Sequence, residues 1–203
     1  MESVKDRFLR YIKIDTESKQ HVEHIPSTEK QLDLCRMLRD ELTRLGAADV
    51  KMDKHGYVTA SIPSSTKKAA PIVGLLAHVD TVDAVSGANV KPVLTPNYGG
   101  QNIDMGNGYT LSPAQFPELL DHLGEEIICS DGTTLLGADD KAGVAEIMTL
   151  AECLLSPGAP EHGPVRIGFT PDEEIGRGVD LFDVAGFGAD FAYTVDGGAL
   201  GEI

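Results

Sequence analysis

The apolar positions of the first 45 residues follow the period of an α-helix. Two amphipathic helices are therefore predicted, one at the start of the chain and one that stops at Gly46. Their apolar stripes are Val4, Phe8, Tyr11 and Ile12, and then Leu34, Cys35, Leu38, Leu42 and Leu45. Thr28 and Gln31 have the spacing of a capping box, so we expect them to cap the second helix.

Shorter apolar runs without this period predict strands. Residues 49–63 read as two strands joined by a turn at His55-Gly56. Three further runs, expected to be core strands, are "PIVGLLAHV" (71–79), "PVRIGFT" (164–170) and "DFAYTV" (190–195). The first of these should be parallel to its neighbours, because it is apolar throughout. Residues 141–155 have the pattern of a buried helix.

The pattern dissolves between residues 86 and 124, where Gly, Asn and Pro are frequent. This composition predicts a long loop excursion, and long loops in compact domains are often functional. A short helix is expected from Ser112-Pro113 to Leu123. The segment that follows, 126–137, predicts a hairpin about Asp131-Gly132.

Strands that alternate with helices predict an α/β sandwich with a largely parallel central sheet. With 203 residues, 41% of them hydrophobic, the chain can build a substantial core, and no interdomain linker is evident.

Charge and cysteine content narrow the function classes. Seventeen Lys and Arg against 32 Asp and Glu give a net charge of −15. Such a surface repels phosphate backbones and anionic lipid, so neither nucleic acid nor a membrane is expected as a partner. Three scattered cysteines without CxxC spacing fit free thiols in a reducing compartment. The N-terminus does not read as a signal peptide, and a cytoplasmic location is expected.

Acidic residues and one histidine follow the predicted strands. They are His78 and Asp80, Asp139 and Asp140, Asp172, Glu173 and Glu174, and Asp196. Ligands of open α/β sheets bind outside the carboxyl ends of the strands, so these groups should converge if the strands are parallel. Read singly, each has a structural interpretation, such as acids opposing a helix dipole at 139–140 or a solvated turn at 172–174.

Several carboxylates that lie together cannot all stay ionised without a cation. Either some are protonated or metal ions hold them. One histidine with several carboxylates suits zinc, manganese or cobalt. A pair of adjacent metals would use this many acids, as in two-metal aminopeptidases. The sequence has no HExxH, P-loop, GxGxxG or GxSxG motif.

Four motifs together resemble the peptidase T family. They are "HVDT" (78–81), "GADDKAG" (137–143), "TPDEEIGRG" (170–178) and "TVDGG" (194–198). These aminotripeptidases are zinc metallopeptidases related to glutamate carboxypeptidase and aminoacylase. The resemblance covers essentially the whole chain and implies the phosphorylase/hydrolase-like architecture of zinc exopeptidases.

The resemblance also implies the metal ligands. By position, His78, Asp140 and Asp196 are similar to the ligands of one zinc ion. Asp140 would bridge to a second zinc, which Glu174 also binds. A complete site would therefore hold two zinc ions.

The resemblance also implies catalytic roles for two further residues. Asp80 resembles the acid that orients or polarises the His78 ring. Glu173 resembles the general base that takes a proton from the metal-bridging water and passes it to the leaving amine. The Asp139–Asp140 peptide bond is expected to be cis.

The implied activity is release of the N-terminal residue of tripeptides. Residues 1–203 would be the N-terminal portion of the catalytic domain, without the lid and dimerisation domain or the C-terminal part of the catalytic domain. Such a chain should bind one zinc, show little activity alone and expose an edge of its sheet; the longer protein would form a homodimer through the lid.

Two other functions stay open. One is a non-catalytic metal-binding or assembly module. The other is a related amidohydrolase of N-acyl amino acids, which the excursion "MGNGYTLSPAQFPELL" (105–120) disfavours because it resembles peptidase T.

Overall fold

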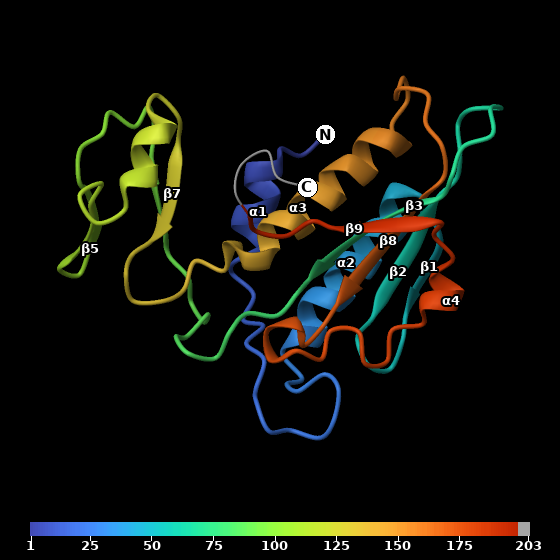
Figure 1. Cartoon of the computed structure of the whole chain (residues 1–203), viewed down its shortest axis with the longest axis horizontal. Coiled ribbons are helices and arrows are strands. Elements are labelled where there is room, and N and C mark those ends of the chain that lie inside the picture. The colour runs from blue at the N-terminus through green and yellow to red at the C-terminus, as the bar shows by residue number, and fades with distance from the viewer. Residues whose placement is uncertain (199–203) are drawn as a thin grey trace.

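A five-stranded sheet forms the centre of the computed structural model, which describes residues 1–198 (Figure 1). The strands lie in the order β1-β2-β8-β3-β9. Their bounds are β1 Ala48–Met52, β2 Val58–Ile62, β8 Val165–Thr170, β3 Val73–His78 and β9 Phe191–Thr194.

Parallel pairing is confined to one half of this sheet. β3 pairs in parallel with β8 and with β9, and the register sets His78 opposite Thr170 and Leu76 opposite Thr194. β1 and β2 are antiparallel, as expected for strands joined by a short turn, and β2 is also antiparallel to β8. The α/β fold is confirmed, and the carboxyl ends of β3, β8 and β9 meet at one edge.

Three helices build the core with the sheet. They are α1 Val4–Tyr11, α2 Gln31–Leu45 and α3 Ala138–Leu155. α2 and α3 contact each other and both contact β2, while α1 packs on α3 (Figure 1). The predicted stripe of α2 is buried at Leu34, Cys35, Leu38 and Leu42, and the helix ends at Gly46 in the left-handed conformation, with φ 87°. A four-residue helix, α4 (Val184–Phe187), precedes β9.

The expected capping box at the start of α2 is wrong. The N-cap residue is Lys30, and no side chain caps the helix. The Gln31 side chain instead donates to Asp172, 141 residues away, at 2.7 Å. Its carbonyl, the group that would accept a local backbone N–H in a capping box, accepts the Asp172 backbone N–H at 3.1 Å.

The expectation that 190–195 forms a core strand is also wrong. All four residues of β9 are exposed, and β9 is an edge strand in the described part of the chain. An apolar run alone does not distinguish a central strand from an exposed edge.

Residues 86–130 are more regular than predicted. They contain β4 Pro92–Thr95, β5 Ile103–Gly106, β6 Tyr109–Leu111 and β7 Ile127–Ser130. β4 pairs with β7 and β5 with β6, around a small core of Tyr98, Ile103 and Cys129. This β4–β7 module stands apart from the main sheet in Figure 1.

Two local predictions in this region fail. The hairpin about Asp131-Gly132 does not form, because β7 pairs with β4, more than 30 residues earlier. The helix expected from Ser112 is only a 3-10 turn, η1 (Pro117–His122). Non-local pairing overrode the turn signal at Asp131-Gly132. Among residues 1–198, no helix combines the length and apolar character needed to cross a bilayer.

Candidate metal centre

His78 is the last residue of β3 and its side chain is only 3% exposed. Its ring Nδ1–H donates to the backbone carbonyl of Asp80 at 3.1 Å, and the Asp80 Oδ1 lies 3.4 Å from the same nitrogen. The ring is thereby turned so that Nε2 faces the edge of the sheet. Asp80 thus contacts the ring it was predicted to orient, through its backbone oxygen as well as its carboxylate.

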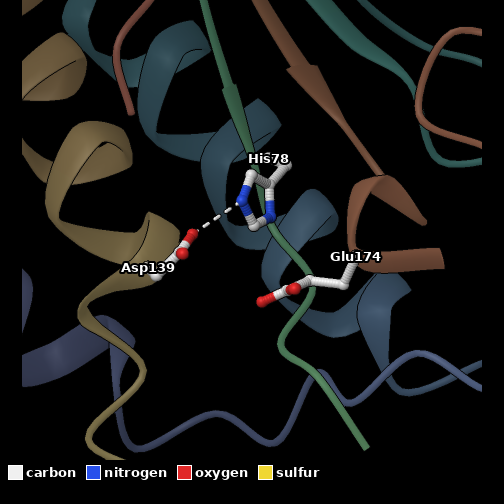
Figure 2. Close-up of side chains that lie close together, drawn as sticks. All are labelled: His78, Asp139 and Glu174. Carbon is white, nitrogen blue, oxygen red and sulfur yellow. Dashed lines mark hydrogen bonds and ion pairs between the residues drawn. The ribbon is translucent and has the colours of Figure 1, made fainter. Parts of the chain in front are cut away.

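Three carboxylates surround Nε2 of His78. Asp139 Oδ1 is nearest at 2.9 Å, as Figure 2 shows, with Asp196 Oδ2 at 3.7 Å and Glu173 Oε2 at 3.8 Å. These acids come from the start of α3, from the segment after β9 and from the segment after β8. The predicted convergence at the carboxyl edge of the sheet is therefore observed for all four segments.

Asp139 and Asp140 point in different directions at the start of α3. The peptide bond between them is cis, as the family resemblance implied, and both residues depart from helical φ and ψ. Asp140 is buried and accepts the His78 backbone N–H at 3.1 Å and the Gly143 N–H at 3.3 Å. The side chain of Asp139 is 65% exposed, yet it reaches the histidine ring.

The segment after β8 turns sharply into η2 (Glu173–Ile175). The carboxylate of Asp80, which is fully buried, accepts the backbone N–H of Glu173 at 2.9 Å and of Glu174 at 3.1 Å. Asp80 therefore ties the end of β3 to the acidic turn, which adds to the ring-orienting role predicted from sequence.

Two sets of three potential ligand atoms lie within 4.8 Å of one another. One is His78, Asp140 and Asp196, the set that the resemblance assigned to one zinc. The other is His78, Asp139 and Glu174 (Figure 2). Asp139 thus stands beside Glu174 where Asp140 was expected, and sequence reasoning did not assign Asp139 a ligand role. The doublet in "GADDKAG" was the only signal that could have indicated it.

The cluster raises the pKa values of its histidine and of two of its acids. Burial would lower the pKa of His78, but the hydrogen bond to Asp80 and the charges of Asp80, Asp140 and Asp139 raise it to about 10. Burial raises the pKa of Asp140 to about 8, and the nearby Asp196 adds to the rise. Burial and Asp139 also raise the pKa of Glu174. Without a cation, the cluster therefore keeps protons that a metal ion would displace.

The donor set fits a divalent metal. It offers one imidazole nitrogen and several carboxylate oxygens, which is the ligand chemistry of zinc, manganese and cobalt sites. The His78 ring is fixed through Nδ1, as ligating histidines usually are, which leaves Nε2 for the metal. A cavity of about 200 Å³ adjoins the cluster and is bounded partly by the apolar side chains of Leu76 and Val179.

Comparisons with known proteins agree with these motifs. The chain is 55% identical over its whole length to peptidase T of Desulfitobacterium hafniense and 52% identical to peptidase T of Clostridium perfringens. It spans about half the length of these curated relatives. No protein-family profile matches it.

Solved structures resemble the fold. A tripeptidase from Staphylococcus aureus and the aminopeptidase PepT from Bacillus cereus each match with a TM-score of 0.67 and 25% identity. The matches cover 97% and 96% of this chain and 43% of each of those chains. The chain is therefore similar, from end to end, to about half of peptidase T, as its four motifs implied.

Proposed function

We propose that this chain carries the metal-binding part of the active site of a zinc-dependent aminopeptidase that releases the N-terminal residue of tripeptides. One observation supports this most: acids from three other segments gather around Nε2 of the buried His78. The names of the similar proteins, peptidase T, tripeptidase and aminopeptidase, supply the substrate class.

His78, Asp140 and Asp196 would hold one zinc ion. By the family resemblance, Asp140 with Glu174 would contribute to a second. Bound there, the metal would supply positive charge that polarises the scissile carbonyl and acidifies water. Asp139 is close enough to His78 to share in the second group. Asp80 keeps the His78 ring in its orientation.

Glu173 is proposed as the general base. Its side chain is 54% exposed, whereas its backbone is fixed by the hydrogen bond to Asp80. Its carboxylate is therefore held at the edge of the cluster but remains accessible to water and substrate. It would accept a proton from the attacking water and donate it to the leaving amine.

The activity proposed is that of the whole protein, because the chain spans half the length of its relatives. We propose residues 1–203 as the N-terminal portion of the catalytic domain, the last five lying outside the described residues.

The test uses the whole protein and follows the release of the N-terminal amino acid from a tripeptide. A chelator should abolish turnover and added zinc should restore it. Glu173→Gln should lower kcat by about 10²- to 10⁴-fold and leave metal content unchanged, because a base is not a ligand. Glu174→Gln should lose metal as well, and Glu161→Gln, at an exposed position, should change neither. Full turnover by Glu173→Gln, or turnover that chelation does not affect, would contradict the proposal.

A further inference from the structure

Asp172 is a buried acid that the proposed chemistry does not use. It precedes Glu173 and Glu174, and its exposed fraction is 0%. We propose that Asp172, held by Ser27 and Gln31, is a positioning residue that sets the two glutamates in place. This inference rests on the proposed function for what the glutamates do. The hydrogen bonds that join Asp172 to Ser27 and Gln31, called the clamp below, do not depend on that function.

Every hydrogen bond that the Asp172 side chain makes with the described residues leads to residues 27–31. Oδ2 accepts the Ser27 backbone N–H at 2.7 Å. Oδ1 accepts the Ser27 hydroxyl at 2.5 Å and the Gln31 side-chain amide at 2.7 Å. In return, the Asp172 N–H donates to the Gln31 side-chain carbonyl at 3.1 Å. Gln31 is fully buried and opens α2, so the acidic turn is anchored to the helical core.

The backbone at Asp172 is left-handed, with φ 60°. Its carbonyl accepts the Arg177 N–H at 2.9 Å, which closes the turn around the glutamates. In this conformation the next two amides both point at the Asp80 carboxylate, at 2.9 Å and 3.1 Å. Asp172 therefore holds the start of the turn from the α2 side, and Asp80 holds its amides from the β3 side.

The glutamate side chains depend on this clamp. The side chain of Glu174 makes no hydrogen bond to any described residue, and that of Glu173 has only the 3.8 Å approach to His78. Their positions near the cluster are thus set by the backbone that carries them. A shift of that backbone would move both carboxylates away from His78.

The test is Asp172→Asn in this chain, because asparagine keeps the shape and tolerates a positive φ. The variant turns an amide N–H₂ toward donors, so the clamp should loosen locally. Amide hydrogen exchange of Glu173 and Glu174 should accelerate about 10- to 100-fold, while α2 and β8 keep their protection. Zinc affinity, measured by calorimetry, should fall by about 10- to 100-fold, which is typical when a partner of a ligand is lost.

Two variants control this experiment. Asp131→Asn removes another mostly buried carboxylate, which accepts the Thr133 N–H just after β7, and should change neither readout. Ser27→Ala removes one donor but keeps the Asp172 charge, so it should show the same local pattern at smaller size even if Asp172→Asn fails to fold.

The outcomes separate this inference from the proposed function. The positioning role would be overturned if hydrogen exchange accelerated equally throughout α2, β8 and η2. It would also be overturned if the exchange rates of the Glu173 and Glu174 amides and the zinc affinity both matched the wild type. A wild-type chain that binds no zinc would contradict the proposed metal centre, while the exchange rates would still decide whether Asp172 clamps the turn.

Discussion

Gly143 lies directly against the backbone of Val195. A Cβ atom at position 143 would overlap the Val195 carbonyl oxygen and come within 2.5 Å of Asp140 Oδ1. Val195 continues the line of β9, where its N–H donates to the Leu76 carbonyl at 2.7 Å. The missing side chain therefore lets the segment after β9 pass close over the first turn of α3 and bring Asp196 to the metal centre.

Gly143→Ala should accordingly damage the site more than the fold. The methyl group must displace both the Val195 carbonyl, which directly precedes Asp196, and the Asp140 carboxylate, and Asp140 and Asp196 are both proposed ligands. We expect zinc affinity, measured by calorimetry, to fall by more than tenfold. Gly99→Ala, where a methyl would meet only the flexible Gln101 side chain, is the matched control. Wild-type zinc affinity in Gly143→Ala would show that the close contact between Gly143 and the Val195 backbone is not required for metal binding.

The strand ends were predictable because their signals are local. An apolar run followed at once by His78 and Asp80 identifies both a strand and the chemistry at its end, and the same holds for the runs that precede Glu173 and Asp196. Contacts between distant segments left no such signal. The sequence around Gln31 indicates a capping role, because nothing near it reveals its true partner, Asp172, which lies 141 residues away.

The same reason explains the remaining misses. Pairing of β4 with β7 depends on residues more than 30 positions apart, so the sequence between them read as a loop. The exposure of Phe191 and Tyr193 depends on which elements cover β9, a question that an apolar run cannot answer. Asp139 reaches His78 only through the local backbone of the 139–140 segment.

The buried thiol of Cys35 should make stability pH-dependent. Burial, with a contribution from the charge of Asp80, raises the pKa of Cys35 from 9.0 to about 12. The unfolded thiol ionises first, so the folded state binds more protons between pH 9 and 12. The stability contributed by this group is full below pH 9 and is lost as pH rises through that window.

Urea unfolding at pH 8, 9 and 10 measures this effect. For one group, the free energy of unfolding falls by at most about 1.4 kcal/mol per pH unit. Cys35→Ala lacks the thiol, so its free energy of unfolding should fall less steeply above pH 9 than that of the wild type. Parallel pH profiles for the two proteins would contradict the assignment.

The exposed edge at β9 should make this 203-residue chain self-associate. Phe191 and Tyr193 are 44% and 47% exposed, and their rings pack edge to face at 5.8 Å. An open edge strand with apolar side chains favours pairing with another chain. Sedimentation should show mass rising with concentration, and Tyr193→Lys should reduce that rise. Phe116→Lys, at an exposed residue outside any strand, should not. Equal association in all three proteins would contradict this role for β9.

The central claim is that His78, Asp140 and Asp196 together hold a metal ion, and zinc titration of this chain by calorimetry tests it most directly. We predict one tight zinc per chain. Asp140→Asn and Asp196→Asn should each weaken it by at least about 100-fold, more than loss of an outer partner typically does. Asp139→Asn, at the largely exposed neighbour, should weaken it less than either. Absence of saturable zinc binding in the wild type, or wild-type affinity in Asp140→Asn, would contradict the account.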